Sequence, residues 1–136
     1  MAYSESQPTV SMIAETTFGS GDLYKFVRMS TVASHVTILG TSNVTGVIGT
    51  LLSVTYTTST GANEAVTVGL LSGKGKVYMA ASTAKAGAPI TASSAGAGVL
   101  ASTDGKELGR IVALTTAGSA SAGRIATVLF NPSYTV

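Results

Sequence analysis

The sequence predicts an all-β protein, either a small antiparallel β-barrel or a β-tulip or sandwich, with an extended N-terminal arm. Its 136 residues provide enough chain for one domain. Hydrophobic residues make up 45% of the chain but aromatic residues only 6%, so small and β-branched side chains must build the core. Glycines separate short apolar runs at intervals of about eight to twelve residues, which is typical of barrels and sandwiches.

The first segment, residues 1–17, shows no sustained periodicity. It contains Pro8, isolated apolar residues and several serines and threonines. Such a segment buries little apolar surface by itself, so we expect an extended arm that becomes ordered on a partner. The remaining residues, 18–136, are expected to form a single β domain.

Three strands are expected in the first half of this domain. A Gly-Ser-Gly-Asp turn at 19–22 precedes a run at 23–28 that mixes aromatic, branched and charged residues as strands do. A second run covers 35–39, and glycine-interrupted runs then lead into a clear alternation at 51–57.

The second half is expected to begin with a β-hairpin. Residues 64–70 alternate, and a glycine-rich turn at 72–75 leads into a second strand at 76–80. Residues 81–101 are rich in Ala, Gly and Ser, which favours short strands and loops over a helix.

The last two strands are expected at 108–114 and 124–130, and Asn131-Pro132 ends the second of them because proline cannot donate to a central ladder. The larger members of the predicted core are Phe26, Leu39, Val54, Val68, Leu114 and Leu129.

No residue pattern in the sequence points to catalysis, a cofactor or a metal. His35 is the only histidine, and the alternation around it predicts an exposed strand position. Asp22 and Asp104 adjoin glycines in turns and Glu64 begins a strand, so structural roles account for these carboxylates. Neither a nucleophile elbow nor a calcium loop is present, and the protein is not expected to be an enzyme.

The charge pattern argues against nucleic-acid and membrane partners. The eight basic residues are scattered, and no run of about 18 apolar residues appears. Lys74, Lys76 and Tyr78 would form a basic strand with a single aromatic platform, which is the minimum for binding single-stranded nucleic acid. A solubilising role for these lysines on an exposed strand is the simpler interpretation.

The order of segments resembles the small decoration, or cement, proteins that coat the heads of tailed phages. The residues that carry the resemblance are Gly21-Asp22-Leu23-Tyr24-Lys25-Phe26, Val44-Thr45-Gly46-Val47-Ile48-Gly49, Lys85-Ala86-Gly87-Ala88-Pro89-Ile90, Gly105 to Leu114 and Gly123 to Pro132. Directly before Pro89, this chain has Ala88 where the family usually has an acidic residue. The resemblance spans residues 18 to 132.

This resemblance implies a virion protein on the outer capsid surface, made in the host cytoplasm, that stabilises the expanded head against internal DNA pressure. The implied partners are the major capsid protein and further copies of the chain in a homotrimer. We expect the arm to extend over the capsid, with Met12, Ile13 and Phe18 as apolar anchors. The alternative is a binding module on a virion or cell surface, namely a fibre base or a carbohydrate-binding β domain.

Overall fold

The computed structural model describes residues 7–40, 46–53, 64–80, 85–101, 107–114 and 124–130, which form an all-β fold as expected. The elements are β1 (Thr9–Ala14), the 3₁₀ turn η1 (Ser20–Asp22), β2 (Phe26–Met29), β3 (His35–Ile38), β4 (Val47–Leu51), β5 (Ala65–Leu70), β6 (Lys74–Met79), β7 (Pro89–Ala92), β8 (Gly98–Leu100), β9 (Gly109–Leu114) and β10 (Arg124–Phe130).

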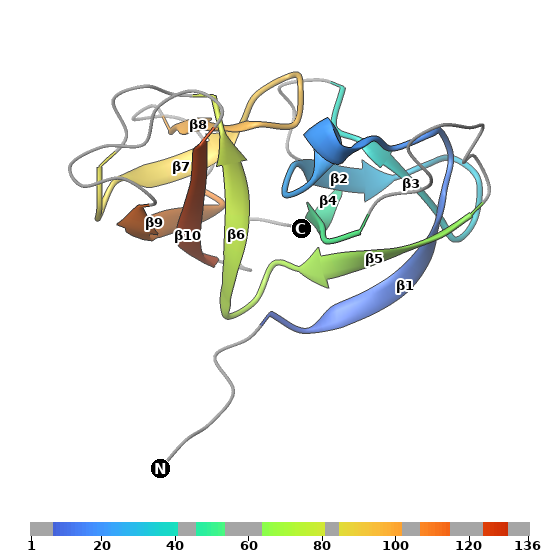
Figure 1. The fold of residues 1–136 in the computed structure, drawn as a ribbon, viewed down its shortest axis with the longest axis horizontal. Helices are drawn as coiled ribbons and strands as arrows, with labels where there is room; N and C mark the ends of the chain where they lie inside the picture. Colours follow the sequence, from blue (N-terminus) through green and yellow to red (C-terminus); the bar gives the residue numbers. More distant parts are fainter. Residues whose placement is uncertain are drawn as a thin grey trace, which may run out of the picture.

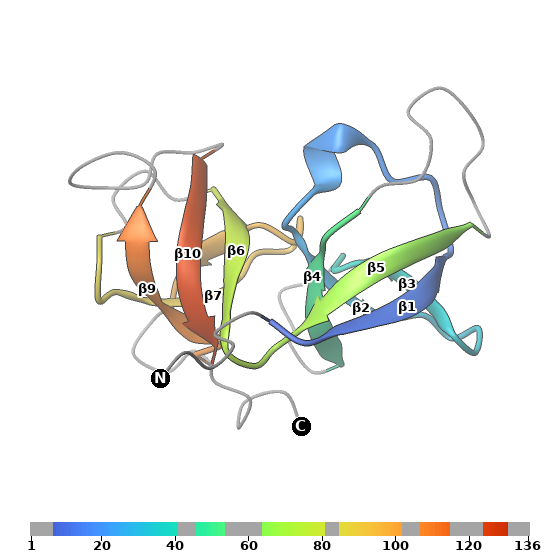
Figure 2. The same ribbon diagram turned by 60° about the horizontal axis from the view of Figure 1, so that its bottom comes forward.

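The ten strands close into two small barrels that lie side by side (Figures 1 and 2). The first barrel has the strand order β1-β3-β2-β4-β5, and β5 closes it by pairing with β1. The second has the order β6-β8-β7-β9-β10, and β10 closes it by pairing with β6. The short connection between β5 and β6 joins the barrels, so each barrel is a continuous half of the chain.

The two barrels repeat one topology. In each, the first and third strands pair in parallel, and every other neighbouring pair is antiparallel. The expected antiparallel barrel is therefore corrected in one respect, because each barrel contains one parallel pair. The same five-stranded topology thus occurs twice in tandem along the chain, which the sequence did not indicate.

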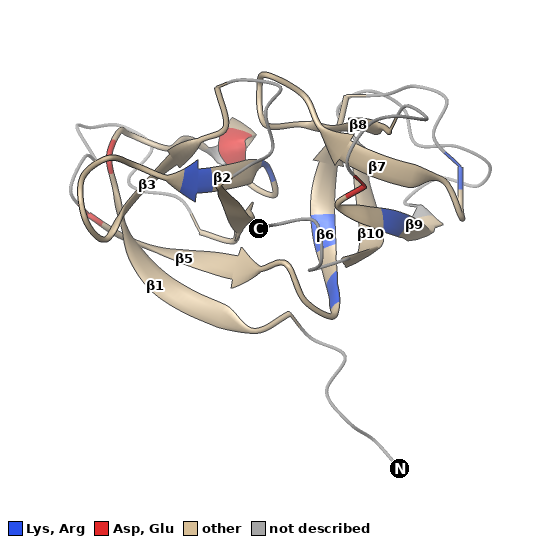
Figure 3. Ribbon diagram, turned by 180° about the vertical axis from the view of Figure 1, so that it is seen from behind, with Lys and Arg blue, Asp and Glu red and all other residues tan. Residues whose placement is uncertain are grey.

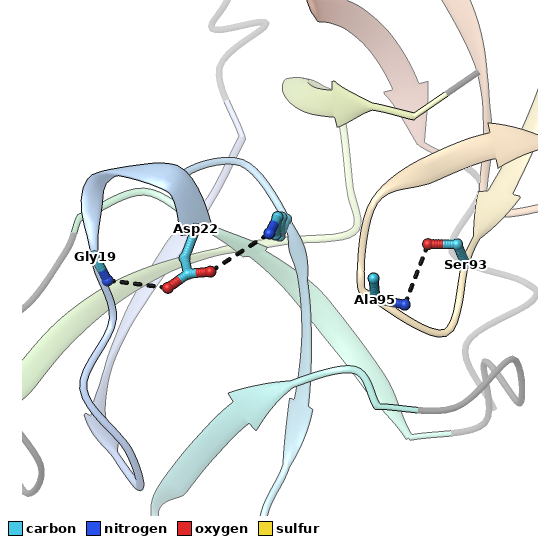
Figure 4. A network of polar contacts seen from close by, with 5 residues as sticks. Gly19, Asp22, Ser93 and Ala95 are labelled. Atoms are coloured by element: carbon cyan, nitrogen blue, oxygen red, sulfur yellow. Dashed lines mark hydrogen bonds and ion pairs between the residues drawn. The ribbon is translucent and has the colours of Figure 1, made fainter. Parts of the chain in front are cut away.

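Hydrogen bonds outside the ladders repeat as well. The amide of Val32 donates to Ser30 Oγ at 3.1 Å, and the amide of Ala95 donates to Ser93 Oγ at 3.2 Å in the corresponding turn of the second barrel (Figure 4). Three further backbone hydrogen bonds of the first barrel have counterparts in the second. Tyr24 N to Leu51 O corresponds to Gly87 N to Ile111 O, and Glu15 N to Val36 O corresponds to Ala80 N to Gly98 O. Leu70 N to Pro8 O corresponds to Phe130 N to Gly73 O. This correspondence assigns equivalent positions in the two halves.

Two apolar clusters hold the barrels together. One fills the first barrel and includes Phe18 and Val68. The other fills the second barrel but also takes in Phe26, Leu39 and Val47 from the first. Because one apolar cluster contains residues of both barrels, the barrels share a core and are not two independent domains.

The predicted arm is corrected over its described part. Residues 9–14 form β1, which pairs with five residues of β5 and with two of β3. An extended segment satisfies its backbone donors and acceptors best in a ladder, and here the ladder lies within the same chain. Residues 1–6 lie outside the described part of the structure.

The predicted hairpin over 64–80 is also wrong. Both strands form, but β5 pairs with β1 and β4, whereas β6 pairs with β10 and β8. The turn after β5, with Gly73 at φ 67°, carries the chain from one barrel into the other. Alternation and a glycine-rich turn identify two strands but not their partners.

The predicted core is confirmed for Phe26, Leu39 and Val68, all fully buried. Leu129 is the exception, since 52% of it is exposed on β10. Val54 and the side chain of Leu114 lie outside the described residues.

Candidate interaction surface

Two of the three predicted capsid anchors lie in or beside the core of the first barrel. Phe18 is 1% exposed and belongs to the apolar cluster of that barrel, against which Met12 packs. Ile13 is half-buried and pairs with Ala65 on one side and His35 on the other. Phe18 and Met12 therefore stabilise the fold, and their assignment as surface anchors is corrected. Ile13 lies between Met12 and Ala14 on β1, whose side chains face the core, so its assignment stays a prediction.

His35 takes the first position of β3 and is half-buried rather than exposed. Its Nδ1 lies 2.8 Å from the carbonyl oxygen of Ala33, a local contact within the turn between β2 and β3. Across the described ranges, no group of three or more His, Asp or Glu side chains is arranged to hold a metal ion. In the same part of the chain, no helix has the length and apolarity needed to cross a membrane.

The outer side of strand β6 is basic. Val77 and Met79 point into the core and are fully buried, and the alternate residues Lys74, Lys76 and Tyr78 face outward. This is the strand pattern that the sequence predicted. Figure 3 shows the two lysines in blue along β6.

The neighbouring strands extend this surface with apolar side chains. In the register of the ladder, Leu129 on β10 lies opposite Lys74 on one side and opposite Arg110 of β9 on the other. Leu129 is 52% exposed and Val112 of β9 is 46% exposed, although neither is polar. We call this surface the basic face, and it consists of Lys74, Lys76, Tyr78, Arg110, Val112 and Leu129.

One end of the basic face is hollowed. An open depression of about 240 Å³ is lined by Glu107, Gly109, Arg110, Leu129 and Phe130. At its rim, Arg110 Nε forms an ion pair with Glu107 Oε1 at 2.6 Å, and Arg110 Nη1 donates to the carbonyl oxygen of Gly87 at 3.3 Å. These contacts fix the guanidinium beside the apolar floor.

At its other end the basic face meets the first barrel through two crossed cation–π contacts. Lys25 Nζ lies 5.4 Å from the ring centre of Tyr78, and Lys76 Nζ lies 5.8 Å from the ring centre of Tyr24. The amide of Tyr78 also donates to the carbonyl oxygen of Tyr24 at 2.9 Å. We call these four residues the clasp. The lysines that would attract phosphates therefore lie over the rings that would stack on bases.

The segment that supplies Tyr24 and Lys25 is held by Asp22. Its Oδ2 accepts the amide of Gly19 at 2.9 Å and its Oδ1 pairs with Lys25 Nζ at 3.5 Å (Figure 4). Tyr24 itself has φ 66°, an uncommon value for a residue with a side chain. The structural role predicted for Asp22 is confirmed.

The equivalent surface of the first barrel is uncharged. Thr9 and Ser11 stand where the second barrel has Lys74 and Lys76. Gly69 corresponds to Leu129 and Thr50 to Arg110, since each pair holds the same place in the ladders.

In the first barrel, the side chain of Gln7 covers Gly69 and Thr50, the equivalents of Leu129 and Arg110. The side-chain amide of Gln7 donates to Thr50 Oγ1 at 3.1 Å and to the carbonyl oxygen of Leu70 at 2.9 Å. A side chain at Gly69 would collide with Gln7. The equivalent surfaces of the two barrels therefore differ, and of the two it is the second barrel whose described residues combine charge with exposed apolar side chains.

Comparison with solved structures identifies a protein with this architecture. The crystal structure of the N base of head fiber gp8.5 from bacteriophage phi29 superposes with a TM-score of 0.59 at 14% sequence identity. The likeness covers 93% of this chain and 96% of the other, so it includes both barrels. This chain shares its fold with the base of a phage head fibre. No protein-family model matches the sequence, and a search of curated proteins finds no match.

Sequence reasoning found the lysines of the basic face but missed Leu129. In 124–130, both sets of alternate residues are largely apolar: Ile125, Thr127 and Leu129 on one side, Ala126, Val128 and Phe130 on the other. The available signal was Phe130, the largest side chain of the strand, which is 5% exposed and marks the inward side.

Proposed function

We propose that this chain is a structural protein of a tailed-phage head that binds the outer surface of the capsid. The observation that carries the proposal is the two-barrel likeness to the phi29 head-fiber base, which extends over nearly the full length of both chains. The resemblance of sequence segments to phage decoration proteins supports the same assignment. The protein is proposed to have no catalytic activity and to reside in the virion after synthesis in the host cytoplasm.

Within this role, we place decoration first. A decoration protein binds the major capsid protein at many equivalent positions and stabilises the expanded head against internal DNA pressure. Closed barrels suit a protein that coats a surface in many copies, because they leave no long unpaired strand edge that could pair with a neighbouring chain. The basic face contains Tyr78 and Arg110, residue types that are enriched at protein interfaces, beside the exposed apolar side chains of Val112 and Leu129.

The second candidate is the base of a head fibre, which the likeness to the phi29 protein favours. A fibre base and a decoration protein differ in what their loss does. Loss of a decoration protein weakens the head, whereas loss of a fibre base removes an appendage and leaves the capsid as stable as before.

A pelleting experiment tests the capsid role. Purified protein is mixed with expanded heads that lack it, and unexpanded heads serve as the control. We expect saturable binding to expanded heads only, and binding to neither would contradict the proposal. A thermal-release assay on heads with and without the bound protein then separates decoration from a fibre base, because only decoration raises the temperature of DNA release.

A further inference from the structure

The two halves of the chain carry opposite charge. Residues 1–71 contain four acidic and two basic side chains, whereas residues 72–136 contain two acidic and six basic ones. The two cations of the first half are both partly enclosed. Lys25 pairs with Asp22 and lies over Tyr78, and Arg28 is half-buried on β2 with its Nε shielded from solvent.

Two acidic residues of the first barrel, Glu15 and Glu64, lie at the end remote from the second barrel. Glu15 directly follows β1, and Glu64 precedes β5 and accepts the amide of Ala14 at 2.8 Å through its backbone oxygen. The two strand ends are therefore adjacent. Figure 3 shows acidic positions at this end of the molecule and basic positions on β6 and β9.

Exposed apolar side chains accompany these acids. Met29 is 38% exposed at the end of β2, and Val32 is 49% exposed in the turn that follows. Met29 pairs with Val36, whose carbonyl oxygen accepts the amide of Glu15, so the apolar and acidic residues belong to one region. We call Glu15, Met29, Val32 and Glu64 the acidic end.

We propose that copies of this chain associate head to tail, with the acidic end of one copy docking on the basic face of the next. Both surfaces mix charge with exposed apolar groups, and their charges are opposite. Because the two patches differ and lie on different barrels, the contact is heterologous, and repeating it closes a ring when the rotation permits. This inference rests on the proposed role in the phage head, for which the resemblance implies a homotrimer, and it names the surfaces that mediate that association.

The basic face fits a protein partner better than a nucleic acid. Phosphate binding needs a dense array of cations, whereas here Leu129 and Val112 lie among three cations and Glu107 neutralises part of the charge. Exposed ion pairs contribute little individually. The apolar groups therefore supply burial, and the opposite charges select the partner surface and accelerate docking.

Charge reversal with rescue tests this interface. Glu15→Lys with Glu64→Lys makes both surfaces basic, and Lys74→Glu with Lys76→Glu makes both acidic. We expect each double variant to raise the dissociation constant of the assembly about tenfold or more, measured by sedimentation velocity over a concentration series. The quadruple variant restores complementarity with the wild-type net charge, so we expect its assembly to recover.

The matched control is Thr9→Lys with Ser11→Lys, which places two lysines at the equivalent positions of the first barrel. Thr9 and Ser11 are exposed and belong to neither surface, so assembly should be unchanged. Circular dichroism melts of all variants confirm that each is folded.

A monomeric wild-type protein at all concentrations would overturn the inference, as would assembly that is indifferent to both double variants. Failure of the quadruple variant to recover would equally reject a direct contact between the two surfaces. Capsid binding is measured separately by pelleting. If the protein binds heads but the variants leave assembly unchanged, the interface is wrong and the capsid role stands. If the variants change assembly as expected but the protein does not bind heads, the capsid role is wrong and the interface stands.

Discussion

Single residues in this protein are constrained chiefly by how closely the strands approach. A side chain at Gly49 would collide with the backbone oxygen of Gly69, and one at Gly109 would collide with that of Leu129. These glycines hold equivalent places in the two barrels, because Gly49 pairs with Leu70 and Gly109 with Phe130. The two barrels thus share a backbone requirement at this place although the surrounding side chains differ.

Gly49→Ala and Gly109→Ala should each destabilise the protein by about 3 kcal/mol, because the added methyl group must push two strands apart. Urea denaturation followed by circular dichroism measures the change. Gly40→Ala is the control, since no atom lies within 4 Å of its added Cβ. Equal stability of Gly49→Ala and Gly40→Ala would show that the strands are not in close contact.

Phe18 illustrates what a sequence can and cannot reveal about one residue. Its neighbours have no period, so the sequence assigned it to a partner surface, but the side chain fills the first barrel. We expect Phe18→Ala to cost about 3–5 kcal/mol of unfolding free energy. Val10→Ala on the same barrel should cost well under 1 kcal/mol because Val10 is partly exposed. Similar losses for the two variants would argue against a buried Phe18.

At the scale of elements, strand positions followed from alternation, while strand partners did not. The runs at 35–39, 64–70 and 124–130 correspond closely to β3, β5 and β10. The hairpin expected across 72–75 failed because β5 and β6 each find a partner more than 40 residues away in the chain. Local turn signals carry no information about such distant pairing.

The clasp is the element-scale feature that joins the barrels on their surface. A double-mutant cycle with Lys25→Met and Tyr78→Leu should give a coupling energy of about 0.5–1 kcal/mol, the usual size of an exposed cation–π contact. The same cycle on Lys25 and Tyr24 is the control, because Lys25 lies over Tyr78 and Lys76 lies over Tyr24. A coupling that is equal in both cycles would contradict the crossed arrangement.

For the whole molecule, composition was sufficient to predict the β class but not the repeated topology. Equivalent positions such as Tyr24 and Gly87, or Thr50 and Arg110, hold different residues, so no internal sequence repeat is visible. What the halves share is hydrogen bonding between backbone groups, which many sequences can satisfy. Of the basic face, the sequence predicted only the β6 residues, because the alternation of Lys74 and Lys76 indicates an exposed side of a strand.

The shared core predicts that the two barrels unfold together. Phe26 belongs to the first barrel but packs within the cluster that fills the second, so neither half keeps a complete core alone. Differential scanning calorimetry should show one transition, and Phe26→Ala should shift the entire peak to lower temperature. Two resolved peaks, with only one of them moved by the substitution, would mean that the barrels are independent.

The parallel pairs have a mechanical consequence. In the second barrel β6 meets β8 in register only at Met79 and Gly98, whereas β6 meets β10 over six residues. Under a pulling force, two strands paired at one residue separate before two strands paired at six. Each barrel is therefore mechanically weakest where its two parallel strands pair. In the proposed capsid role, internal pressure would load these subunits, and the direction of the force relative to the parallel pair would decide whether a barrel opens or holds.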